Sequence, residues 1–202
     1  MTQKIFAAAA LAMAATVATP ALAQDAGLPF DGPYVAVMAG WDRVQVDTPL
    51  GDGSDDGFLY GGVLGFDKNI NGFIVGIEGE VADSTTKETI ANAFVLGDRV
   101  SVKSGRDLYA GVRLGGEVAS GVMLYAKGGY TNARVKGVYD NGTSVVRDAT
   151  NLDGYRLGAG VETNVGGLLG RLEYRFSDYG NFEGTGLKPD RHQVAAMLGY
   201  RF

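Results

Sequence analysis

The chain has 202 residues, a formal net charge of −5, 32 glycines and no cysteine. An acidic balance argues against a nucleic-acid partner, which would need a basic surface. The lack of cysteine excludes a disulfide-stapled scaffold, a thiolate nucleophile and a thiolate metal site. The glycines show neither a collagen period nor a long Gly/Ser linker, and they sit inside segments that alternate apolar and polar residues.

The first residues have the features of an export signal. Lys4 supplies a positive charge, residues 5–17 form an apolar run, and Ala21-Leu22-Ala23 provides a small-residue cleavage site. The run is too short for a membrane-spanning helix. The sequence therefore predicts a cleaved signal peptide over residues 1–23 and a single domain over residues 24–202.

Eight segments of that domain alternate apolar and polar residues, as half-buried strands do. In the last one, the apolar Val194, Ala196, Leu198, Tyr200 and Phe202 share one face, and Arg191, Gln193 and Arg201 share the other. In the centre of every segment the charged residues occupy only one of the two alternating sets of positions, that is, one parity. The segments are 34–46, 58–67, 73–82, 107–117, 122–138, 154–162, 168–179 and 191–202.

The connections between these segments alternate in length. Three are short (68–72, 118–121 and 163–167), and four are long (47–57, 83–106, 139–153 and 180–190). Outer-membrane barrels have short periplasmic turns and longer extracellular loops, and strands of about 9–11 residues cross the bilayer at a tilt. The pattern predicts an all-β fold, a closed up-and-down antiparallel barrel of eight transmembrane strands.

A soluble eight-stranded barrel of the lipocalin type is the main structural alternative. It would turn the charged parity outward into water and place the apolar parity inside. The expected signal peptide, the asymmetry of the connections and the terminal Phe202 favour the membrane barrel, whose apolar face meets lipid.

Several segments resemble the OmpA/OmpX-type outer-membrane β-barrels, also described as the porin-family or outer membrane beta-barrel domain. The resemblance covers nearly all of residues 24–202. It implies a location in the outer membrane, contact with membrane lipid and lipopolysaccharide, and assembly with periplasmic chaperones and the barrel-insertion machinery. Tyr200 and Phe202 would form the signal that this machinery reads. The similar segments are Tyr34-Val35-Ala36-Val37-Met38-Ala39-Gly40-Trp41, Gly76-Ile77-Glu78-Gly79-Glu80, Arg113-Leu114-Gly115, Tyr125-Ala126-Lys127-Gly128-Gly129-Tyr130, Gly158-Ala159-Gly160-Val161-Glu162 and Glu173-Tyr174-Arg175-Phe176.

The inward parity carries the candidate functional residues. An eight-stranded barrel has an interior just wide enough to be filled by side chains, and opposite charges there should pair, because an unpaired buried charge is costly. Two interpretations stay open: a salt-bridged plug that closes the lumen, and a polar path for small solutes that could be gated. The residues are Glu78, Glu80, Glu162 and Glu173 with Arg113, Lys127, Arg156, Arg171, Arg175 and Arg201.

No enzyme, metal site or cofactor is expected. The single histidine, His192, has outward parity, whereas the neighbouring Ser177 points inward, so the two could not form a nucleophile–base pair. The acidic segment 52–57 begins like a calcium loop, but Val63 stands where the bidentate glutamate is required. A closed barrel has no free edges, so a monomer is expected.

These features predict an outer-membrane protein with a structural role in envelope integrity and weak passive permeability for small solutes. The alternative is an adhesin or immune-evasion protein that binds ligands through its long extracellular loops. The connection 83–106 decides between them, because it contains the apolar triplet Phe94-Val95-Leu96. We expect the strands to extend beyond the membrane and pair there. Deleting residues 86–100 should spare assembly and any conductance but abolish adhesion.

Overall fold

The computed structural model describes residues 29–48, 51–91, 99–140, 142, 144–179 and 188–202. The expected signal peptide and the triplet Phe94-Val95-Leu96 lie outside these residues. All regular structure within them is β-strand. No helix in the described part of the chain is long and apolar enough to cross a membrane.

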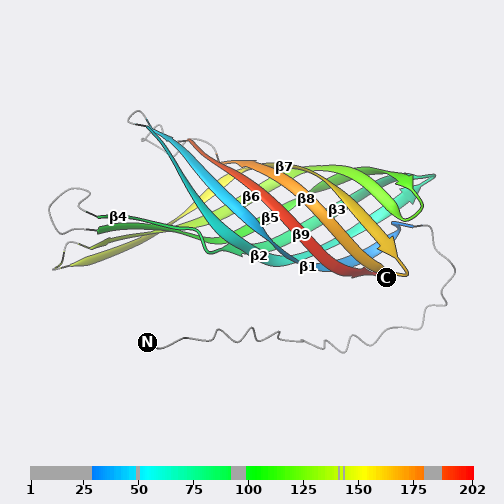
Figure 1. The fold of residues 1–202 in the computed structure, drawn as a ribbon, viewed down its shortest axis with the longest axis horizontal. Coiled ribbons are helices and arrows are strands. Elements are labelled where there is room, and N and C mark those ends of the chain that lie inside the picture. Colours follow the sequence, from blue (N-terminus) through cyan, green and yellow to red (C-terminus); the bar gives the residue numbers. More distant parts are fainter. Residues whose placement is uncertain (1–28, 49–50, 92–98, 141, 143, 180–187) are drawn as a thin grey trace, which may run out of the picture.

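The strands form a closed antiparallel ring (Figure 1). β1 pairs with both β2 and β9, and β3 pairs with β5, so no strand of the ring lacks a neighbour on either side. β4 pairs with β5 just beyond the end of β3 and continues that strand, so the ring itself has eight strands. The bounds are β1 Gly32–Thr48, β2 Gly51–Ile70, β3 Phe73–Ser84, β4 Lys87–Ala91, β5 Arg99–Ala119, β6 Val122–Asp140, β7 Val145–Val165, β8 Leu168–Asp178 and β9 Lys188–Arg201.

The three predicted short turns are confirmed, and each has only two residues between strands. Asn71 and Gly72 both have positive φ (55° and 88°), as do Gly166 and Gly167 (59° and 86°), which is the backbone of a type I′ hairpin. These turns lie at one end of the barrel, together with the start of β1 and the C-terminus (Figure 1). There the Phe202 amide donates to the Pro33 carbonyl at 2.9 Å.

Strands occupy most of the predicted connections 47–57, 83–106 and 139–153. For 83–106 this agrees with the expectation that the strands extend beyond the membrane, whereas the loops predicted for 47–57 and 139–153 are wrong. β1 and β2 stay paired as far as Thr48 and Gly51, and β6 and β7 as far as Asp140 and Val145. Residues 180–187 of the fourth connection lie outside the described part. Outside the bilayer both faces of a hairpin meet water, so the alternation of apolar and polar residues ends there. The strands nevertheless continue, because their backbones remain hydrogen-bonded. Figure 1 shows these extensions as projections at the end opposite the short turns.

The outer surface of the barrel wall is apolar. Val37, Leu64, Ile77 and Leu157 are each more than half exposed in the isolated chain, as expected for groups that meet lipid. Aromatic side chains mark both borders of this surface, in the arrangement of interfacial girdles. They are Trp41, Tyr60, Tyr130, Tyr155 and Tyr174 toward the extensions and Phe66, Phe73, Tyr200 and Phe202 toward the turns.

Candidate functional site: the charge network of the lumen

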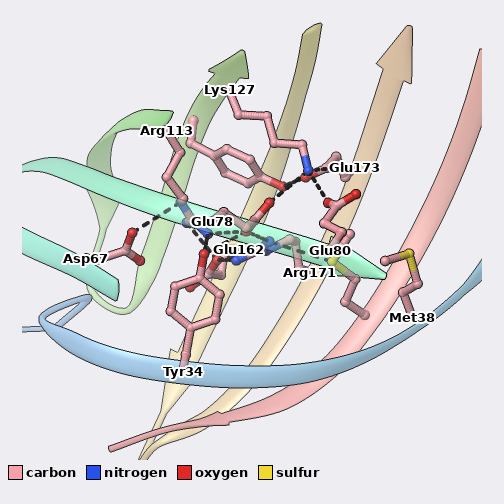
Figure 2. Close-up of polar contacts among 12 residues, drawn as sticks. Tyr34, Met38, Asp67, Glu78, Glu80, Arg113, Lys127, Glu162, Arg171 and Glu173 are labelled. Carbon is pink, nitrogen blue, oxygen red and sulfur yellow. Dashed lines mark hydrogen bonds and ion pairs between the residues drawn. The ribbon is translucent and has the colours of Figure 1, made fainter. Parts of the chain in front are cut away.

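All ten charged residues predicted for the lumen point into it and are buried. Each alternates along its strand with residues that face outward. On β5, for example, Arg113 is fully buried, whereas its neighbours Val112 and Leu114 are about half exposed. Figure 2 shows how side chains from opposite walls meet in the middle of the barrel.

Glu78 on β3 connects three other strands. Its carboxylate accepts a hydrogen bond from the Tyr34 hydroxyl of β1 at 2.6 Å and from the Lys127 ammonium of β6 at 2.8 Å. It also pairs with the Arg171 guanidinium of β8. One carboxylate therefore links strands that are far apart around the ring.

The Lys127 ammonium lies among three carboxylates. It is 2.8 Å from oxygens of both Glu78 and Glu173, and it also contacts Glu80. The three carboxylates come close enough together to hold a metal ion. The Lys127 ammonium already occupies the space between them and supplies the positive charge, so the cluster is a set of three ion pairs centred on this lysine.

Toward the turns, Glu162 is the common partner of three arginines. Its carboxylate lies 2.8 Å from Arg113, 2.7 Å from Arg171 and 2.8 Å from Arg201. Arg201 also pairs with Asp67 at 2.7 Å. This end of the network thereby joins β9, the last strand, to β2 and β7.

Toward the extensions, Asp107 pairs with Arg156 at 2.6 Å and with Arg191 at 2.9 Å. Arg191 holds Asp42 through two parallel hydrogen bonds of 2.6 Å, the strong bidentate geometry of an arginine–carboxylate pair. Gln193 adds a bond to the same carboxylate at 3.0 Å. Arg156 and Arg175 reach inward to Glu80 at 3.0 and 2.7 Å, so the ion pairs continue along the lumen.

Four further charged residues belong to this network but were not among the ten predicted for it: Asp42, Asp67, Asp107 and Arg191. Each has the inward parity of its strand, so the same alternation could have identified them. Asp67, Asp107 and Arg191 stand at the ends of the predicted segments 58–67, 107–117 and 191–202. With them, the buried charges of the described residues balance, seven acids against seven bases. The acids are Asp42, Asp67, Glu78, Glu80, Asp107, Glu162 and Glu173, and the bases are Arg113, Lys127, Arg156, Arg171, Arg175, Arg191 and Arg201.

Tyrosine rings fill the space between the charged groups. The Arg113 guanidinium lies 4.4 Å from the centre of the Tyr125 ring, and that of Arg201 lies 4.7 Å from the Tyr34 ring, both within cation–π range. Inward glycines make room for these rings. A Cβ added at Gly160 would come within 2.7 Å of the Tyr125 hydroxyl, and one at Gly65 would meet the Tyr34 ring.

The network has two consequences for the lumen. The side chains that form its central pairs have no exposed surface, so water does not reach them in this conformation. In addition, each of the fourteen charges has an opposite charge within ion-pair distance, as a low-dielectric interior requires. The arrangement can close the lumen without leaving net charge inside it.

The other residues considered from the sequence lie elsewhere. Tyr200 and Phe202 are on the lipid face, with their rings 5.2 Å apart in an edge-to-face contact. Ser177 is buried in the lumen and accepts a hydrogen bond from Arg156 at 2.8 Å. His192 is on the outer face, where its Nδ1 lies 2.7 Å from the Tyr174 hydroxyl. The structure therefore does not bring Ser177 and His192 together.

The strand extensions carry exposed charges of a different kind. Arg43 on β1 donates to Asp56 on β2 at 2.8 Å, and this hydrogen bond holds the pKa of the Asp56 carboxyl below its ordinary value. On the neighbouring projection, Lys103 of β5 lies directly opposite Lys136 of β6. Both lysines are exposed, and no ion pair among the side chains that the structure describes neutralises them.

Comparison with known proteins agrees with this architecture. Residues 7–202 match the family model of the outer membrane protein beta-barrel domain. The 25 kDa outer-membrane immunogenic protein of Brucella ovis is 27% identical over 164 residues, which cover 81% of this chain and 72% of that protein. Its counterpart from Brucella abortus is 27% identical over 170 residues, with 81% and 74% coverage.

Two solved structures share the fold. The attachment invasion locus protein Ail of Yersinia pestis, in complex with the heparin analogue sucrose octasulfate, superimposes with a TM-score of 0.52 at 17% identity, covering 85% of this chain and 99% of that chain. Neisserial surface protein A gives a TM-score of 0.52 at 16% identity, covering 83% and 97%. Since the family model spans almost the whole chain, this protein belongs to the outer membrane protein beta-barrel domain family, and it is an eight-stranded barrel of the cell outer membrane.

Proposed function

We propose that this protein is a structural barrel that supports the integrity of the outer membrane, with a lumen closed at rest and passive permeability that is at most weak. The observation that carries the proposal is the balanced network of seven buried acids and seven buried bases. A water-filled pore needs a polar lining that solvent reaches, whereas these ion pairs join opposite walls and have no exposed surface.

We further propose that the protein is a monomer and is not an enzyme. The pairing of β1 with β9 closes the ring, so the barrel wall needs no second chain to satisfy its backbone. The separation of Ser177 from His192 supports the absence of a hydrolytic centre. The positions of Tyr200 and Phe202 on the lipid face suit recognition by the insertion machinery, with periplasmic chaperones as earlier partners.

Deleting the gene in the source bacterium tests the structural role. Loss of the protein should increase sensitivity to detergents and to bulky hydrophobic antibiotics, and the intact gene should restore resistance. A version that lacks residues 86–100 should restore it equally well, because the barrel wall would remain complete. Unchanged sensitivity in the deletion strain would contradict the proposal.

A second candidate function rests on the projection formed by β4 to β7. Lys103 opposes Lys136, and Arg134 lies two residues before Lys136 on the same face of β6. Like charges in direct opposition destabilise a strand pair, so their presence favours an anionic ligand that would neutralise them. This supports an adhesin role toward sulfated or phosphorylated polysaccharides, including the phosphates of lipopolysaccharide. The sulfated sugar analogue bound by Ail is a suitable probe.

Binding of sucrose octasulfate to the refolded barrel tests this second function. A Lys103→Ala, Lys136→Ala double variant should weaken binding and reduce its salt dependence. Lys68→Ala, which removes an exposed lysine at the opposite end, is the matched control and should bind as the unmodified protein does. Equal binding by all three proteins would exclude this surface.

A further inference from the structure

The end of the lumen at the short turns is closed by apolar side chains. Phe30, which precedes β1, is fully buried there in a cluster with Ile74 of β3 and with Met123 and Tyr125 of β6. This cluster adjoins the charge network, because Met123 stands opposite Glu162 in the β6–β7 ladder and Arg201 lies 5.9 Å from the Phe30 ring. Phe30 is the only member of this cluster that does not belong to a strand of the barrel wall.

The backbone turns sharply to place Phe30 in the mouth of the barrel. Phe30 has a φ of 61°, a left-handed conformation that a residue with a β-carbon keeps only where its surroundings hold it. Two residues later, Gly32 has a φ of 106°, and a Cβ at this position would come within 2.6 Å of the Phe202 carbonyl oxygen. The two positive φ angles fold the segment back toward the lumen.

Contacts on two sides hold this segment in place. The Asn69 side chain, at the end of β2, donates to the Pro29 carbonyl at 2.6 Å, and Lys68 pairs with Asp31 at 2.8 Å. From β9, the Arg201 guanidinium donates to the Gly32 carbonyl at 3.2 Å and lies 5.9 Å from the centre of the Phe30 ring. The conformation of Phe30 is therefore fixed by neighbours that the rest of the fold already positions.

We propose that residues 29–32 form a stopper for the periplasmic mouth of the lumen, with Phe30 as its apolar head. The stopper is a second closure, separate from the charge network. The ion pairs belong to wall strands and cannot part without rearranging the barrel, whereas Phe30 can leave without breaking a strand pair. Its departure would open an apolar vestibule lined by Ile74, Met123 and Tyr125, while the ion pairs of the charge network would stay in place.

The absence of cysteine makes the stopper directly testable, because a single introduced thiol is an unambiguous reporter. Ile74→Cys places a thiol against Phe30, and Thr131→Cys places one at the far end of the lumen, where Thr131 bonds to Asp107 at 3.0 Å. The measurement is the rate at which a small cationic methanethiosulfonate reagent modifies each thiol in the refolded barrel, since modification requires a solvent-exposed thiolate. Heat-modifiable migration confirms that each variant is folded.

A series at position 30 separates the ring from the backbone. Phe30→Ala should raise the modification rate of the thiol at position 74 by about tenfold or more, because the local opening no longer has to expel the ring. Phe30→Gly should do the same, although glycine suits the left-handed φ better. Phe30→Leu should keep the rate low. Phe66→Ala, which removes an exposed ring from the lipid face near the same end, is the control and should change nothing.

Four outcomes would overturn the proposal. The thiol at position 74 could react rapidly with Phe30 intact, or Phe30→Ala could leave its rate unchanged, or Phe30→Gly could protect it as well as the native residue does. The thiol at position 131 must stay protected throughout, and equal gains at both thiols would indicate general loosening and also contradict a stopper. The test is distinct from that of the closed-lumen proposal. If the thiol at position 74 becomes exposed in the Phe30→Ala barrel while that barrel still passes no current, both proposals are supported.

Discussion

The lumen and the projection formed by β4 to β7 use charge in opposite ways. In the lumen, seven acids and seven bases are buried and each lies within ion-pair distance of an opposite charge. On the projection, Lys103 and Lys136 face each other in water. A buried charge without a partner is expensive, so the lumen has to balance, whereas solvent and salt screen an exposed pair. The fold therefore constrains the charged residues of the lumen, whereas the charges of the projection need no partner within the protein.

The largest expected effect comes from breaking the balance inside the lumen. Glu80→Ala removes the shared partner of Lys127, Arg156 and Arg175. The free energy of unfolding should fall by about 3–5 kcal/mol, because buried cations are left unpaired. Urea-induced unfolding in lipid vesicles measures it. Asp148→Ala on the exposed part of β7 is the control, and an equal loss there would show that burial does not set the cost.

The next effect tests the lipid face of the same wall. Leu157→Arg places a charge on the outer surface of β7 and should cost about 2–4 kcal/mol of unfolding free energy near the bilayer midplane. Val165→Arg, on the same strand at the turn end, should cost only about 0–1 kcal/mol, because the side chain reaches the interface. The same refolding assay compares the two. Equal losses would mean that the membrane does not lie where the aromatic girdles indicate.

A smaller effect sharpens the contrast by removing both partners of one buried pair. Asp42→Asn and Arg191→Gln should each destabilise the barrel, and the double variant should lose less than the sum of the two. The coupling energy should lie at about 0.5–3 kcal/mol, the range for residues in direct contact. Strict additivity would mean that the bidentate contact between Asp42 and Arg191 contributes nothing specific.

The smallest effect is expected on the projection. Lys103→Gln removes one of two opposed like charges, so the stability of the barrel should stay the same or rise slightly at low salt. Thermal unfolding at low and high ionic strength measures this change. A loss comparable to that of Glu80→Ala would contradict the division between a constrained lumen and a permissive projection.

The barrel wall was predictable from the sequence because its environment has a simple period. Lipid on one side and a packed lumen on the other force apolar and polar residues to alternate, and that alternation placed Glu78 inside and Ile77 outside. Apart from the extension expected within 83–106, the strand extensions were not predictable in the same way, because water on both faces removes the alternation. Segments rich in glycine, aspartate and serine, such as 51–57, therefore resembled loops.

The sequence predicts which charged residues point into the lumen, but not which of them pair with one another. Parity identifies Asp42 and Arg191 as inward residues, but their pairing depends on the register of β1 against β9 across the closure of the ring. The three partners of Lys127 come from strands whose relative height depends on the shear of the barrel. Phe30 was missed altogether, because its burial arises from two local turns outside any alternating segment.

Single-channel conductance of the refolded mature chain in a planar bilayer tests the central claim most directly. The account predicts silence from a folded, heat-modifiable barrel, because the ion pairs close the lumen. Glu78→Gln, measured beside it, weakens the hub that joins Tyr34, Lys127 and Arg171, and is the variant most apt to show brief openings. Steady, discrete openings of the unmodified protein that change with Glu78→Gln would contradict the account and establish an open path through the lumen.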